Sequence, residues 1–114
     1  MKSVKWIGSS KKDLLEFPKE VRFEIGHALY VAQKGETCES AKLFKGHGSG
    51  VYEIVSDYDT NAYRAIYIVN IGDAVYVLHA FQKKSKKGIK TPKEEIAVIE
   101  ERLKQLKQMI KDKR

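Results

Sequence analysis

The sequence predicts an α+β domain in which one small antiparallel sheet of about four strands packs with helices. Three strand-like runs, Val51–Asp57, Tyr63–Asn70 and Ala74–Lys83, follow one another with short joints rich in turn-forming residues. Segments with helical spacing lie before and after these runs, which predicts two N-terminal helices and one C-terminal helix. The length of 114 residues is that of a single domain, residues 1–114.

The N-terminal part of the chain is expected to form one strand and two helices. Val4–Ile7 is short, apolar and aromatic, which is typical of an opening strand. Ser10 stands three residues before Asp13, an approximate capping signal for a helix that ends near Phe17. Pro18 fits the first position of a second helix, where its missing N–H costs nothing. The expected buried stripe of this second helix comprises Val21, Ile25, Ala28, Leu29 and Ala32.

Glycines mark the interior and the end of the second helix. Gly26 should cost this helix about 1 kcal/mol relative to alanine, so we interpret it as a point of close packing against the sheet. Lys34 and Gly35 are residue types that commonly end a helix. The segment from Lys42 through Phe44 to Gly50 is expected to be a loop. Its part Lys45–Gly50 superficially resembles a phosphate loop, but it lacks the terminal Gly-Lys-Ser/Thr and leads into a strand, so a flexible entry to the strand is favoured over nucleotide binding.

The C-terminal helix has a well-defined start. Thr91, Pro92 and Glu94 provide a hydroxyl N-cap, a proline at the first position and an acidic residue at the third. The apolar face that follows is expected to pack on the sheet or on a partner. This face comprises Ile96, Ile99, Leu103, Leu106 and Ile110.

Composition favours a soluble, basic protein without a resident metal or cofactor. The chain has 22 Lys and Arg against 15 Asp and Glu, a formal charge of +7, so polyanions are attracted in a salt-dependent way. Cys38 is the only cysteine, which excludes an intramolecular disulfide. His27, His47 and His79 have no Cys or carboxylate at ligand spacing. No apolar run approaches the ~20 residues that span a bilayer, so a cytoplasmic location without membrane contact is expected.

The densest positive charge follows the last strand-like run. Lys83–Lys87 contains four lysines, and Lys90 comes shortly after. This segment is either an ordinary solvated loop or a nucleic-acid contact whose first residues are held by a strand. Phe81, directly upstream, is suited to stacking on an unpaired base, although filling the core is the simpler interpretation.

Arg64 is an unusual residue in its position, near the start of an otherwise apolar strand. Burying an unpaired charge is costly, so the guanidinium needs an anion. The partner is either Glu53 or Asp57 on the adjacent strand, or a phosphate, for which the planar fork of arginine is well shaped. The two interpretations are compatible.

Four short motifs extend over nearly the whole chain. In chain order they are Lys5–Ser10 (KWIGSS), Ala41–Leu43 leading through glycines into Val51–Ile54, Tyr63–Tyr67 (YRAIY), and Leu78–Ser85 (LHAFQKKS) followed by Thr91-Pro92. In this order and spacing they resemble the RelE/HigB toxins of the ParE/RelE superfamily, and most closely their phage-associated, Gp49-like HigB branch. The resemblance implies a RelE-like fold.

The resemblance also implies a function. Such proteins are toxins of type II toxin–antitoxin systems that act as ribosome-dependent mRNA endoribonucleases (mRNA interferases). The reaction is attack by the ribose 2′-hydroxyl on the adjacent phosphate, without metal or cofactor. The implied partners are a cognate antitoxin, usually with a helix-turn-helix domain, the ribosome and mRNA.

Catalytic residues are carried over by motif. Arg64 matches the strand arginine that contacts the scissile phosphate, and Lys83 and Lys84 match the basic end of the last strand. RelE has lysines where this chain has Glu53 and Val55 in Val51–Asp57.

The C-terminal tyrosine of RelE falls near Thr91, so that role is vacant too. His79 or His47 is left as an acid/base candidate, and His79 shares a strand face with Phe81 and Lys83. For His79 the alternative is a structural histidine whose hydrogen bonds are satisfied within the fold.

A wider set of residues is expected to contact RNA. It comprises Lys42, Lys45, His47, Phe81, Lys86, Lys87 and Lys90. Two other interpretations remain open: a non-catalytic RelE-fold module that binds RNA or the ribosome, and a phage-derived protein-interaction module that uses its C-terminal helix for assembly.

Overall fold

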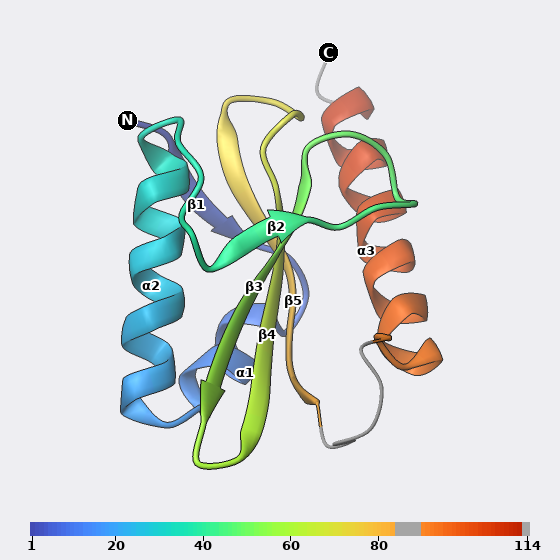
Figure 1. Cartoon of the computed structure of the whole chain (residues 1–114). Coiled ribbons are helices and arrows are strands. Elements are labelled where there is room, and N and C mark those ends of the chain that lie inside the picture. Colours follow the sequence, from blue (N-terminus) through green and yellow to red (C-terminus); the bar gives the residue numbers. More distant parts are fainter. Residues whose placement is uncertain (84–89, 113–114) are drawn as a thin grey trace.

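The computed structural model describes residues 1–83 and 90–112, which form one sheet between two layers of helices (Figure 1). The α+β class is confirmed. α1 and α2 cover one face of the sheet and α3 covers the other. In chain order the elements are β1 (Ser3–Trp6), α1 (Ser10–Leu15), α2 (Lys19–Gln33), β2 (Ala41–Leu43), β3 (Val51–Tyr58), β4 (Asn61–Ile68), β5 (Ala74–Lys83) and α3 (Lys93–Asp112).

The sheet has five strands in the order β1-β5-β4-β3-β2 and is mixed. The expectation of about four antiparallel strands was wrong in two respects. β1 pairs with β5 in parallel, Ser3 lying opposite Ala74, whereas the other pairs are antiparallel. The segment expected to be a loop at Lys42 contains β2, which pairs with β3. Three residues are too short to display the alternation that identifies a strand.

The central meander of β3, β4 and β5 is confirmed, including its turns. Asp59 and Thr60 connect β3 to β4 with φ values of 50° and 67°. Positive φ at both central residues matches the twist of a tight hairpin. Gly72, with a φ of 63°, lies in the β4–β5 connection.

A register shift interrupts the pairing of β4 with β5. Ile66 lies opposite His79, but the next residue, Tyr67, lies opposite Val77, so β5 has one extra residue at Leu78. Such a bulge changes which side chains face a given side of the sheet. The bulge allows Leu78 and the later residue Phe81 to join the same, α3-facing cluster.

Two apolar clusters hold the layers together. The α2 face packs Val21, Ile25, Ala28, Leu29 and Ala32 of α2 against the sheet, as the sequence predicts. The α3 face packs Ile99, Leu103 and Leu106 against Ile66, Ile68, Tyr76 and Leu78. Of the five residues predicted for the apolar face of the C-terminal helix, Ile99, Leu103 and Leu106 are buried against the sheet, and Ile96 and Ile110 are half-buried.

The helix starts differ from expectation by about one residue. Ser9, not Ser10, precedes α1, and its Oγ donates a hydrogen bond to Asp13 Oδ2 at 2.7 Å. Ser10 is instead buried and donates to the carbonyl of Val77 at 3.0 Å. Pro18 and Pro92 each lie just before a helix, rather than at its first position.

Arg102 connects α3 to β5 and to the segment between β1 and α1. Its guanidinium donates to the carbonyl of Leu78 at 3.0 Å and to Ser9 Oγ at 2.9 Å. Gly8, with a φ of 59°, leaves room for this side chain, since a Cβ there would lie 2.6 Å from Arg102 Nε. The helix is therefore joined to the β1–α1 connection by hydrogen bonds as well as by apolar packing.

The interpretation of Gly26 as a packing glycine was wrong. Gly26 is exposed, and a Cβ at this position would meet no atom within 4 Å. Gly35, just after α2, also has open space, but its φ is 86°.

We predict that Gly26→Ala raises the free energy of unfolding by about 1 kcal/mol, because alanine is the better helix former and meets no obstacle. Gly35→Ala is the matched control. It should lower the free energy of unfolding by about 1–2 kcal/mol, because a side chain is strained in the left-handed region. Urea denaturation of both variants checks this pair of opposite signs, and a destabilised Gly26→Ala would contradict it.

Candidate functional site

A polar cluster occupies the α3-facing side of the sheet. It consists of Glu53 on β3, Arg64 on β4 and Lys83 at the end of β5. Lys42 on the edge strand β2 lies directly opposite Glu53. Residues directly opposite one another on paired strands point to the same face. Three neighbouring strands and an edge strand therefore contribute charged side chains to one place.

The centre of the cluster is an ion pair between Arg64 and Glu53. Nη1 of Arg64 donates to Oε2 of Glu53 at 2.8 Å, and the two side chains are 13% and 6% exposed. Of the two partners considered for Arg64 within the chain, the structure selects Glu53. Asp57 is exposed near the end of β3.

Arg64 keeps donor capacity beyond this pair. Its Nε is buried and has no hydrogen-bond partner among the residues that the structure describes. A buried donor without a partner costs about 1–3 kcal/mol. The site therefore holds a guanidinium that is only partly satisfied by the protein.

Lys83 is 5% exposed, an unusual degree of burial for a lysine. Burial lowers the pKa of its ammonium group below the usual 10.5, and the positive charge of Arg64 lowers it further. Glu53 opposes this shift and Lys42 adds to it. The same three neighbours thus control how tightly Lys83 holds its proton.

The cluster and its edge residue carry excess positive charge. Arg64, Lys83 and Lys42 surround one carboxylate, that of Glu53. An incoming anion would compensate this excess, and the largest gain is expected where the cations are shielded from water. The arrangement can therefore bind a phosphate and offers both a proton acceptor and a proton donor beside it.

His79 lies on the same face but its ring is held by the protein. Nε2 lies 2.7 Å from Glu95 Oε1, and Nδ1 lies 3.3 Å from Nη1 of Arg102. Because a guanidinium only donates, Nδ1 accepts from Arg102, and the N–H group at Nε2 donates a hydrogen bond to Oε1 of Glu95. These contacts correspond to the alternative of a satisfied structural histidine, which joins β5 to α3.

Phe81 lies directly opposite Arg64 and is 6% exposed. Its ring stacks on that of His79, with centroids 5.0 Å apart. Phe81 belongs to the apolar cluster under α3, in agreement with the simpler interpretation as a core residue.

The other predicted RNA contacts are dispersed over the surface. Lys42, Lys45 and Lys90 are exposed. His47 is half-buried, stacks on Phe44 at 4.9 Å and places Nδ1 3.5 Å from Glu100 Oε2. Lys84, Lys86 and Lys87 lie outside the described residues.

Sequence reasoning named Glu53 only as a possible ion-pair partner of Arg64, and it assigned no role to Glu95 or Arg102. Glu53 interrupts the apolar face of β3 in the same way that Arg64 interrupts that of β4, a signal visible in the alternation. Glu95 and Arg102 are seven residues apart, which places both on one face of α3. Their target, His79, is not deducible from that spacing.

Within residues 1–83 and 90–112, the His, Cys, Asp and Glu side chains form no group of three or more that is arranged to hold a metal ion. Over the same ranges, no helix combines the length and the apolar character needed to cross a membrane.

Comparison with known proteins identifies the family. A family model described as "Phage derived protein Gp49-like (DUF891)" matches residues 12–104, which contain most of α1, the polar cluster and the N-terminal part of α3 up to Lys104. Searches of curated proteins and of solved structures gave no significant match. The chain therefore belongs to the phage-derived Gp49-like family, a RelE/ParE-like toxin family associated with toxin–antitoxin systems.

Proposed function

We propose that this protein is the toxin of a toxin–antitoxin module and cleaves mRNA on the ribosome. The observation that carries the proposal is the polar cluster, in which Arg64 and Lys83 lie with Glu53 on one face of a rigid sheet. Family membership supports the toxin role. The chemistry proposed is metal-independent attack of the ribose 2′-hydroxyl on the adjacent phosphorus.

In this proposal Arg64 binds the scissile phosphate. Its planar donors suit the oxygens of a phosphate, and they stabilise the charge that grows on those oxygens in the transition state. The ion pair with Glu53 fixes the guanidinium before the substrate arrives. Such preorganisation avoids the cost of orienting the group during the reaction.

Glu53 and Lys83 are proposed to move the two protons of the reaction. The carboxylate of Glu53 accepts the 2′-hydroxyl proton as the 2′-oxygen forms a bond to phosphorus. The bond from phosphorus to the 5′-oxygen breaks, and the ammonium of Lys83 donates a proton to that oxygen. The products are a 2′,3′-cyclic phosphate and a 5′-hydroxyl. The lowered pKa of Lys83 makes it a better proton donor than an exposed lysine.

His79 has a positioning role in this scheme. Its contacts with Glu95 and Phe81 hold the strand that ends in Lys83. The acid/base role for which the sequence made His79 a candidate is therefore assigned, in this proposal, to Glu53 and Lys83.

The proposed partners are mRNA, the ribosome and a cognate antitoxin, usually a helix-turn-helix protein in this branch, all in the cytoplasm. The charge of +7 favours association with ribosomal RNA. Lys84, which directly follows Lys83 in the sequence, remains a proposed catalytic residue, and Lys86 and Lys87 remain proposed RNA contacts.

A second candidate function is a RelE-fold module that binds RNA or the ribosome without cutting. It is favoured by the engagement of both His79 ring nitrogens and by the pairing of Arg64 with a carboxylate. Induced expression separates the two candidates: a protein that binds ribosomes and leaves growth unchanged would support the non-catalytic module.

We predict that Arg64→Ala reduces cleavage of a translated message by about 10²–10³-fold, as expected for loss of a preorganised transition-state donor. Primer extension with purified protein and ribosomes measures the cuts. Since Arg64→Ala leaves a buried carboxylate unpaired, Arg64→Lys is tested beside it. This variant keeps the charge for Glu53 but lacks the planar fork, and it should also cleave poorly.

The control for both variants is Lys19→Ala, which removes an exposed cation from α2, on the opposite side of the sheet. It should cleave at the wild-type rate. Unchanged cleavage in a folded Arg64→Lys and Arg64→Ala would remove Arg64 from the mechanism.

We also predict a pH signature of Lys83 in the stability of the protein. Its folded-state pKa is below 10.5, so between the folded and unfolded pKa values the unfolded chain binds more protons. The contribution of Lys83 to the free energy of unfolding therefore rises with pH through that window.

Urea denaturation of the wild type and of Lys83→Met at several alkaline pH values isolates this contribution as the difference between the two proteins. The wild type should gain stability relative to Lys83→Met as pH increases. A difference that is constant with pH would show that burial does not weaken the hold of Lys83 on its proton.

A further inference from the structure

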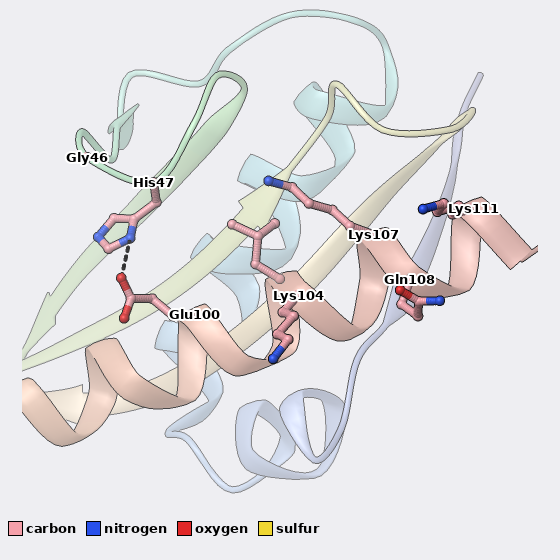
Figure 2. Close-up of a pocket in the computed structure, with 8 residues that line it drawn as sticks. Gly46, His47, Glu100, Lys104, Lys107, Gln108 and Lys111 are labelled. Atoms are coloured by element: carbon pink, nitrogen blue, oxygen red, sulfur yellow. Dashed lines mark ion pairs between the residues drawn. The ribbon is translucent and has the colours of Figure 1, made fainter.

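A second basic region lies at the other end of α3 from the polar cluster. A groove of about 410 Å³ separates the C-terminal half of this helix from the loop between β2 and β3 (Figure 2). Gly46 and His47 form the loop side, and Lys104, Lys107 and Lys111 lie on the helix side. The region is called the lysine groove below.

The three lysines share one side of the helix, since residues three and four apart are neighbours on a helix surface. None of Lys104, Lys107 and Lys111 forms an ion pair with a residue that the structure describes. Only Lys111 is in the last turn, where the helix dipole itself favours a cation. Three lysines therefore face one carboxylate, that of Glu100, in the described lining of the groove.

The described lining of the groove has one carboxylate, that of Glu100, whose side chain is 60% exposed. Glu100 faces His47 at one end of the groove, with Oε2 3.5 Å from Nδ1 of the imidazole (Figure 2). This contact connects the loop to α3 and leaves the remainder of the described lining without another carboxylate. The opening between loop and helix thus offers cations to a ligand.

We infer that the lysine groove binds the phosphodiester backbone of RNA, at a position separate from the cleavage site. Lysine ammonium groups are compact charges that bind phosphate without requiring a fixed geometry. Lysine is depleted in the centres of protein–protein interfaces, where aromatic anchors dominate. The lining has Leu103 as its apolar residue and no aromatic ring besides the imidazole of His47, so RNA fits the groove better than an acidic protein does.

The groove and the polar cluster are far enough apart to contact different phosphates. Glu95 of α3 touches His79 beside the cluster, and Lys107 is twelve residues further along the helix. At 1.5 Å per residue, the two positions are about 18 Å apart along the axis. This inference rests on the proposed function in taking RNA as the ligand, but it assigns the groove to binding and not to the chemical step.

The test compares two triple variants with equal loss of charge. Lys104→Gln, Lys107→Gln and Lys111→Gln are combined in one protein, and Lys11→Gln, Lys12→Gln and Lys19→Gln in the control. All six lysines are exposed, and those of the control lie on α1 and α2 on the other side of the sheet. Circular dichroism and thermal unfolding confirm that both variants are folded.

Binding is measured with two probes that give no cleavage signal. One is a single-stranded 2′-O-methyl RNA oligonucleotide, which lacks the attacking hydroxyl, and the other is the ribosome without mRNA. The salt dependence of affinity is recorded for each. If all three lysines contact phosphate, the slope of log affinity against log salt concentration on the single strand should become shallower by about 2 in the groove variant. The control should keep the wild-type slope.

The outcomes separate the alternatives. A shallower slope on the oligonucleotide assigns the groove to a single strand such as mRNA, and a shallower slope on the ribosome alone assigns it to ribosomal RNA. Equal slopes for the groove variant and the control on both probes would overturn the inference. A loss of affinity for an acidic partner protein, with unchanged slopes on both RNA probes, would overturn it too. Failure of the proposed cleavage would not affect these readings, because neither probe is cut.

Discussion

The charged face of the sheet depends on the ion pair between Glu53 and Arg64. A carboxylate that is 6% exposed and a guanidinium that is 13% exposed are stable there because each compensates the other. Removing either partner leaves a buried charge, which typically costs about 3–5 kcal/mol. The pair also sets the electrostatic surroundings of Lys83, whose pKa is lowered by burial and by Arg64. In the proposed function, the same pair orients the guanidinium of Arg64 for a phosphate.

The backbone contributes to the site through one irregularity. The register shift after Ile66 adds a residue to β5, and beyond it His79 and Phe81 lie on the face covered by α3. Arg102 and Glu95 then hold the histidine ring from the helix. The contacts of His79 and Phe81 thereby hold the end of β5 that carries Lys83. Gly8 of the opening motif leaves space for Arg102, because a side chain at this position would collide with the guanidinium.

Local patterns in the sequence were sufficient for the meander, the helices and the apolar faces. The strand Ala74–Lys83 and the buried stripe of α2 are found as predicted. What the patterns missed depends on contacts between distant residues. β1 pairs with a strand about 70 residues later, and β2 gains its extended shape from pairing with β3. Gly26 was misinterpreted because the low helix propensity of glycine does not show whether another element packs against that position, and none of the described elements does.

The candidate site, like the fold, was predictable where a local pattern signals it and not where it depends on contacts between distant residues. A lone arginine in an apolar strand indicated that a buried anion was needed, and Glu53 was one of two expected partners. The partners of His79 were not predictable, because the sequence alone does not fix which residues of α3 pack over the histidine. The lysine groove was missed because its two sides, Gly46-His47 and Lys104–Lys111, are brought together only by the packing of α3.

The central claim is that the polar cluster is a phosphate site in which Arg64 and Lys83 act together. The most direct measurement is an NMR titration of the Lys83 side chain with pH, in the absence and presence of an uncleavable 2′-O-methyl dinucleotide. We expect the pKa of Lys83 to lie below 10.5 in the free protein and to rise with the dinucleotide, because a bound phosphate offsets the charge of Arg64 and favours the ammonium form. A pKa of Lys83 that is unchanged while the dinucleotide binds would contradict it.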